Sequence, residues 1–130
     1  MTVEQRLLAL SILLGLVNDV AASHLISAQY GYAWTASTRE KEMPRLTGVA
    51  SRVDAAFTNF LETFPFFAAA VLIASILNRH NALTVWGAYL YFTGRVAYLI
   101  FFAAGWGLLR SLIWNVATIG IIVSVVALFL

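Results

Sequence analysis

The sequence has no cysteine and little charge among its 130 residues. Without cysteine there can be no disulfides, thiolate metal sites or cysteine nucleophile. The two histidines, His24 and His80, are far apart in the chain, so we predict no metal site. Charged residues make up only 11% of the chain, whereas soluble domains contain about 25%. The polar residues are therefore too few to cover the surface of a soluble protein.

Hydrophobic residues instead make up 62% of the chain and gather in long runs. A helix of about 20 residues crosses the hydrocarbon layer of a membrane. The runs long enough to do so cover about residues 7–28, 53–77, 82–104 and 109–130. The two later connections are short, which makes their flanking helices antiparallel neighbours. The sequence predicts an all-α membrane protein, a single domain over residues 1–130 built as an antiparallel bundle of four transmembrane helices.

The only long polar connection covers residues 29–51, and Pro44 argues against a continuous helix there. Basic residues are unevenly distributed between the two ends of the predicted helices. One end has Arg39, Lys41, Arg45, Arg52 and Arg110, and the other has only Arg6 and Arg79. Under the positive-inside rule, the first and third loops are cytoplasmic and both termini lie on the opposite side. This asymmetry accounts for most of the net charge of +2, so no nucleic-acid partner is needed to explain it.

Three polar residues recur within the second predicted span. Arg52, Asn59 and Glu62 are separated by 7 and then 3 residues, which places them on one side of a helix. A charge at the centre of a transmembrane helix costs about 2.5–3.5 kcal/mol on insertion scales. This side of the helix should therefore point into the bundle, as a structural contact or as a functional site.

Counting residues along the helices places several opposite charges at one depth. Glu62 and Arg95 each lie about 15 Å from the same end of their helices, and Asp19 lies at a similar depth. We therefore expect a buried ion pair between Glu62 and Arg95, with Asp19 as a possible second acceptor. Such a pair needs further hydrogen bonds inside the bundle, which Asn59 or Tyr98 can provide.

The third predicted span has a regular face. Its members are Thr84, Ala88, Tyr91, Arg95, Tyr98 and Phe102, at alternating spacings of 4 and 3 residues. A guanidinium suits a carboxylate ligand, and a phenol can donate a hydrogen bond to a thiolate. The alternative interpretation is that Arg95 neutralises Glu62 and that the tyrosines only pack the bundle.

Three segments, Asn59–Pro65, Gly94–Tyr98 and Arg110–Ser111, resemble in order the motifs of the MAPEG family. These are the membrane-associated proteins in eicosanoid and glutathione metabolism, including microsomal glutathione transferases and microsomal prostaglandin E synthase. The resemblance extends over nearly the whole chain. It implies a homotrimer that holds glutathione at subunit interfaces near the cytoplasm, with a lipophilic substrate arriving from the bilayer lipids.

The resemblance also implies roles for individual residues. Asn59, Glu62, Arg95 and Tyr98 match residues that contact glutathione in the family. Tyr98 is also expected to donate a hydrogen bond on the substrate side of the site. Arg110 matches the arginine that stabilises the glutathione thiolate, because a nearby cation favours that form of a thiol. Arg110 and Tyr98 are therefore the predicted catalytic residues.

The chain also departs from the family pattern. The positions that are most often basic in active relatives are Ala55 and Thr58, and a second family tyrosine is replaced by Phe102. Each lost charge-assisted contact removes about 1.5–3 kcal/mol, or an order of magnitude or more in affinity. Arg52, nearer the membrane surface, is the residue expected to compensate in part and to contact glutathione.

Two function classes follow. One is a glutathione-dependent transferase or peroxidase acting on lipophilic electrophiles or lipid hydroperoxides. The other is a non-catalytic lipid-binding or scaffolding trimer of the same family. The retained Asn59, Glu62, Arg95, Tyr98 and Arg110 favour the enzyme, whereas Ala55, Thr58 and Phe102 favour the second class.

Overall fold

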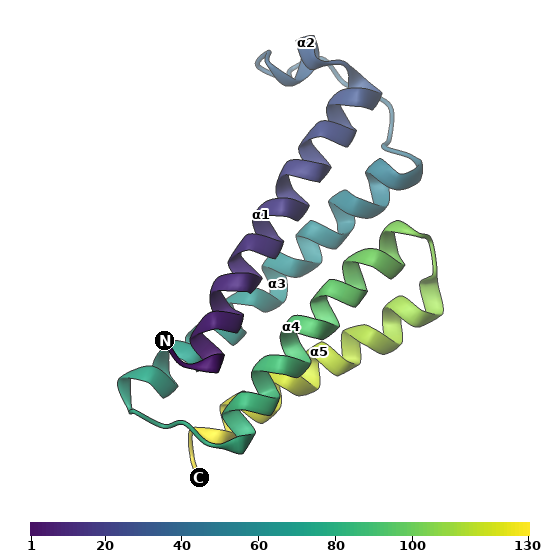
Figure 1. Ribbon diagram of the computed structural model, residues 1–130. Coiled ribbons are helices and arrows are strands. Elements are labelled where there is room, and N and C mark those ends of the chain that lie inside the picture. Colours follow the sequence, from purple (N-terminus) through teal and green to yellow (C-terminus); the bar gives the residue numbers. More distant parts are fainter.

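The computed structural model describes residues 1–130 and consists of helices joined by short connections (Figure 1). The helices are α1 (Val3–Tyr30), α2 (Tyr32–Thr35), α3 (Gly48–Ile76), α4 (Ala82–Ala103) and α5 (Gly107–Ala127). All except α2 are long and apolar enough to cross a membrane. The prediction of an all-α membrane protein with four spanning helices is confirmed.

The predicted helix boundaries differ from the observed ones mainly at polar ends. Helix α1 begins at Val3 because the Thr2 hydroxyl accepts a hydrogen bond from the Gln5 amide, while the Gln5 side chain caps Thr2. Helix α3 begins five residues before the predicted span, at Gly48, and continues through Pro65. Transmembrane helices tolerate an internal proline because neighbouring groups satisfy the freed carbonyl. The short helix α2 was not predicted.

The bundle is antiparallel and consists of two pairs of helices. Helices α1 and α3 lie side by side, and α4 and α5 form a hairpin beside them (Figure 1). Both termini lie at one end of the bundle with the turn between α3 and α4. We call this the terminal end, and we call the opposite end, with α2 and the turn between α4 and α5, the α2 end (Figure 1). The predicted order of antiparallel neighbours is confirmed.

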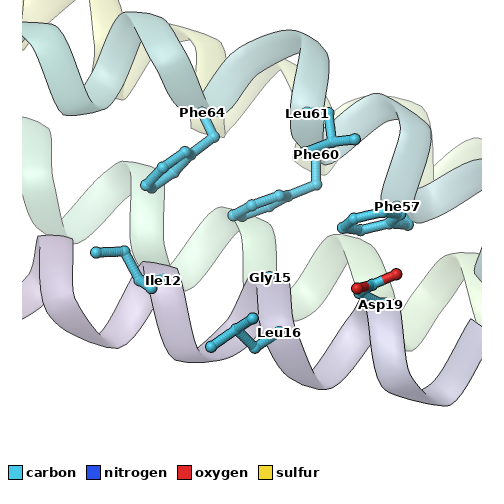
Figure 2. Close-up of a pocket in the computed structure, with 8 residues that line it drawn as sticks. All are labelled: Ile12, Gly15, Leu16, Asp19, Phe57, Phe60, Leu61 and Phe64. Carbon is cyan, nitrogen blue, oxygen red and sulfur yellow. The ribbon is translucent and has the colours of Figure 1, made fainter.

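Helices α1 and α3 approach closely at Gly15. A Cβ atom on Gly15 would lie 2.5 Å from Cε1 of Phe60, so the glycine makes room for the phenyl ring (Figure 2). One turn further along α1, the buried Asn18 amide donates to the Val53 carbonyl at 3.1 Å and accepts from the Phe57 amide at 3.2 Å. These contacts fix the register of α1 against α3.

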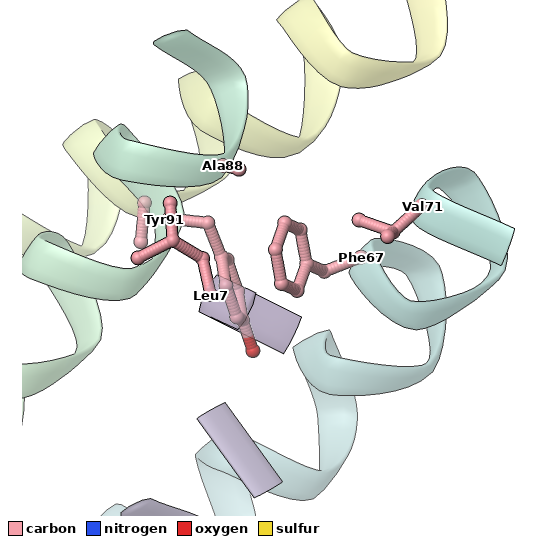
Figure 3. Close-up of a cluster of buried hydrophobic side chains, with 6 residues drawn as sticks. Leu7, Phe67, Val71, Ala88 and Tyr91 are labelled. Carbon is pink, nitrogen blue, oxygen red and sulfur yellow. The ribbon is translucent and has the colours of Figure 1, made fainter. Parts of the chain in front are cut away.

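The apolar core lies where α1, α3, α4 and α5 meet. The Phe67 and Tyr91 rings stack with centroids 4.2 Å apart (Figure 3). The Tyr91 hydroxyl is 3.3 Å from that of Thr63. The remaining buried members of this cluster are Leu7, Val71, Ala88 and Ala117. On α4 the predicted face is confirmed, since Thr84, Ala88, Tyr91, Arg95 and Tyr98 are buried and Phe102 is half-buried.

The terminal end has its own polar contact. The carboxylate of Glu4, on α1, is buried and accepts a short hydrogen bond from the hydroxyl of Thr84, on α4. Nδ1 of His80, in the turn between α3 and α4, lies 3.5 Å from the same carboxylate. This contact ties α1 to the start of α4.

Helices α4 and α5 pack most closely at glycines. A Cβ atom on Gly120 would lie 2.6 Å from the Tyr91 backbone nitrogen and 2.8 Å from the Gly87 carbonyl oxygen. Backbone atoms cannot move aside as a flexible side chain can, so any larger residue there must separate the two helices.

We expect Gly120→Ala to lower the free energy of unfolding by about 1–3 kcal/mol, because the added methyl group overpacks this contact. The measurement is the thermal unfolding midpoint of the purified protein in a neutral detergent. Gly107→Ala is the matched control, since a Cβ atom on Gly107 meets nothing within 4 Å. Equal midpoints for Gly120→Ala and the control would contradict the assignment.

Candidate functional site

The centre of the candidate site is Arg95, on α4. Its side chain is only 2% exposed, and its Nη1 donates to Oδ1 of Asn59, on α3, at 2.7 Å. The guanidinium carbon lies 4.2 Å from the ring centroid of Tyr98 and 5.7 Å from that of Phe60. A cation over an aromatic face is stabilised by the ring quadrupole, more strongly where water is excluded. One neutral amide and two rings thus hold this buried cation.

The predicted ion pair between Glu62 and Arg95 is wrong. Glu62 is exposed on the outside of the chain and forms no ion pair. The inward face of α3 is set by its buried residues, which include Val53, Ala56 and Phe60. Residues three positions apart in an α-helix point in directions that differ by about 60°. Asn59 and Glu62 therefore lie on different flanks of α3. Asn59 reaches the bundle and Glu62 does not.

Asp19 is likewise not an acceptor for Arg95. Its side chain is exposed and lies beside Phe57 in a groove between α1 and α3 (Figure 2). The prediction rested on the depths of these charges, which were estimated from helix lengths. Depth alone does not fix the direction in which a side chain leaves its helix.

Arg110, at the start of α5, joins the site from the other side of Tyr98. Its Nη1 donates to the Tyr98 hydroxyl at 3.5 Å, and its guanidinium carbon lies 4.7 Å from the ring centroid of Phe102. Tyr98 therefore stands between two guanidinium groups, with its ring against Arg95 and its oxygen toward Arg110. Phe102 lacks a hydroxyl but provides an aromatic surface for Arg110.

A small, open cavity of about 220 Å³, lined mostly by polar residue types, lies beside Arg110. Its lining comes from α3 and α5 and consists of Asn59, Arg110, Ser111, Trp114 and Asn115. Trp114 and Asn115 were not among the predicted site residues. The spacing in the sequence could have indicated Asn115, because it follows Ser111 by four residues and so lies on the same side of the helix. In the structure its amide donates to the Ser111 carbonyl oxygen at 2.9 Å.

The predicted contacts Asn59, Arg95, Tyr98 and Arg110 thus come together toward the α2 end of the bundle, whereas Arg52 has a different position. Its Nε donates to the Ala103 carbonyl at 3.0 Å, which caps the C-terminus of α4. A cation at a helix C-terminus is favoured by the helix dipole. Arg52 does not line the cavity.

The two positions where the family resemblance leads one to expect basic residues are exposed. Ala55 and Thr58 are both exposed on α3, and the Thr58 hydroxyl donates only to the Asp54 carbonyl of its own helix. Arg52, the residue expected to compensate for them, is instead bound to α4.

A family model described as MAPEG family matches residues 7–130, almost the entire chain. No curated protein matches the sequence.

Asn59→Ala should destabilise the protein, because it removes the only hydrogen-bond acceptor of the buried Arg95 guanidinium. The expected loss is about 1–3 kcal/mol, the cost of an unsatisfied buried polar group. Glu62→Gln is the matched variant and should cause a clearly smaller loss, because Glu62 has no partner in the chain. Thermal unfolding in detergent without added thiol measures both. A larger loss in Glu62→Gln would restore the ion-pair interpretation.

Proposed function

This chain belongs to the MAPEG family, and from that premise we propose that it is a glutathione-dependent transferase or peroxidase. Its substrates are lipophilic electrophiles or lipid hydroperoxides within the membrane. The observation that carries this proposal is the position of Arg110, which lines the cavity and contacts the hydroxyl of Tyr98.

The residues beside the cavity suit a thiol with an anionic group. The Arg110 guanidinium has a single weak hydrogen bond, at 3.5 Å, and therefore keeps donors for a ligand. Behind it, Nε of Arg95 is buried without a partner. The positive charge of these two arginines is not cancelled by a carboxylate of the chain, since neither forms an ion pair. A cation beside a thiol favours the thiolate.

Glutathione supplies the nucleophilic sulfur, and the residues of this chain hold and activate it. Arg110 stabilises the thiolate, and the Tyr98 hydroxyl donates toward the substrate. Asn59 lines the cavity, and Arg95, which does not line it, is held to Asn59 by the 2.7 Å hydrogen bond. Glu62, exposed on the outer flank of α3, is suited to the ammonium group of the peptide.

The same geometry supports a homotrimer with sites between subunits. The cavity of about 220 Å³ is smaller than the roughly 300–1,000 Å³ of typical ligand pockets, so one chain covers only part of a tripeptide. Glu62 is an exposed carboxylate on a transmembrane helix, and such a group is stable only against protein or water. A second copy of the chain would enclose both.

The distribution of basic residues also predicts which side of the membrane the site faces. Arg39, Lys41 and Arg45 lie in the connection at the α2 end, and the positive-inside rule assigns this end to the cytoplasm. The cavity would then open toward the compartment that contains reduced thiols.

A non-catalytic lipid-binding or scaffolding trimer is the second candidate. The observation in its favour is the surface of α3 around Ala55 and Thr58, which is exposed and where neither residue can bind a carboxylate as a cation. In this case the arginines of the site would only stabilise the bundle.

Titration with glutathione near neutral pH should produce a saturable ultraviolet thiolate signal in the wild-type protein. Arg110→Ala should abolish this signal, and Arg110→Lys should retain part of it, because Lys keeps the charge without the planar fork. Arg79→Ala, at the terminal end, is the control and should behave as wild type. A full signal in Arg110→Ala would overturn the role of Arg110. No binding to the wild type at millimolar glutathione would favour the lipid-binding alternative.

Native mass spectrometry of the detergent-purified protein tests the assembly. We expect three copies of the chain as the main species, and the same species for Arg110→Ala, because Arg110 contacts its own chain. A monomer that gives a full thiolate signal would show that the site is complete within one chain.

A further inference from the structure

A second cavity lies between α1 and α3 and is open on the outside of the chain. This groove has a volume of about 190 Å³ and shares no lining residue with the cavity beside Arg110. Its wall on α3 is a row of side chains that includes Phe57, Phe60 and Phe64, and its wall on α1 includes Ile12 and Leu16 (Figure 2). Gly15 forms the floor, where the Phe60 ring packs against the backbone of α1.

Asp19 is the one charged residue of this groove. Its carboxylate lies at one end of the row of rings, beside Phe57 (Figure 2). Asp19 is 11 residues from Tyr30 at the end of α1, or about 16 Å along the helix, which is well inside a hydrocarbon layer about 30 Å thick. The Asp19 carboxylate accepts no side-chain hydrogen bond and forms no ion pair within the chain. The one ion pair of the chain joins Glu4 and His80.

An exposed carboxylate at this depth requires a partner, because its charge is costly in lipid. No arginine or lysine of this chain lies within 4 Å of it. The aromatic rings beside it favour the same kind of partner, since the face of a phenyl ring attracts a cation. The carboxylate and the rings therefore select together for positive charge attached to an apolar body.

We propose that this groove binds a lipophilic amine. The ammonium group contacts the carboxylate of Asp19 and the ring of Phe57. The apolar chain follows Phe60, Leu16 and Phe64 and then enters the bilayer. A groove of about 190 Å³ is smaller than typical drug-sized pockets of roughly 300–1,000 Å³, so it encloses only the first part of the chain.

Two other occupants fit the groove less well. A fatty acid would place a second negative charge beside Asp19. An uncharged lipid chain would cover the rings but leave the carboxylate without a partner at membrane depth. The amine is the occupant that satisfies both the rings and the charge.

The test uses the full chain in lipid nanodiscs and a long-chain primary amine with a photoreactive group near its nitrogen. Crosslinks are mapped by mass spectrometry, with dodecylamine and dodecanol as competitors. We expect crosslinks to α1 and α3 around Asp19, and we expect dodecylamine to compete at least about ten-fold better than dodecanol, the value of one charge-assisted contact.

Asp19→Asn should remove this preference for the amine, while Asp54→Asn, which changes a carboxylate outside the groove, should keep it. Leu16→Trp is a second variant that fills the groove from α1 and should reduce crosslinking with Asp19 intact. Equal competition by dodecanol would show a groove for lipid chains only and would overturn the proposal. The absence of crosslinks in α1 and α3 of the wild type would show that another copy of the chain covers the groove, and would also overturn it.

Discussion

The hydrogen bond between Asn59 and Arg95 is the interaction on which the arrangement of the site depends. A guanidinium that is 2% exposed within a helix bundle must have its charge solvated by protein groups. The Asn59 amide oxygen does this at 2.7 Å, and the faces of Tyr98 and Phe60 add their quadrupoles. Because Asn59 is on α3 and Arg95 on α4, the bond also fixes these helices against each other. The position of Tyr98, and through it the contact with Arg110, follows from that register.

The rest of the fold holds this register from both sides. Helices α4 and α5 meet at Gly87, Gly94 and Gly120, where the absence of side chains brings the two backbones together. This close hairpin carries Tyr98 and Arg110 as one unit. On the other side, Asn18 and Gly15 join α1 to α3. Close packing at small residues and hydrogen bonds from buried amides thus stabilise the association of these helices. Apolar burial cannot drive it as in a soluble bundle, because lipid is as apolar as the helix surfaces themselves.

Much of the fold could be predicted from the sequence, whereas the site could be predicted only in part. The four spans follow from hydropathy and length, and the buried face of α4 follows from the spacing of Thr84, Tyr91 and Tyr98. The ion pair between Glu62 and Arg95 was wrong because depth and charge do not determine the rotation of α3 about its axis. That rotation is set by the packing of Phe60 and Phe67, and it turns Asn59 inward and Glu62 outward. The cavity could not be predicted, since it depends on how α5 places Trp114 and Asn115 against Asn59.

The partner of Arg95 is the amide of Asn59 and not the predicted carboxylate, and this determines the charge of the site. A carboxylate at this position would have cancelled the charge of the guanidinium and left a neutral pair. An amide satisfies the same donor but leaves the full positive charge in place, in a region where water screens it poorly. Tyr98 then lies between this charge and that of Arg110, with its ring against Arg95 and its hydroxyl toward Arg110. Arg52, in contrast, is bound by the C-terminal carbonyl of α4 and adds little to this field. Because the partner of Arg95 is an amide and not an acid, this part of the bundle keeps the positive charge that the proposed thiolate site requires.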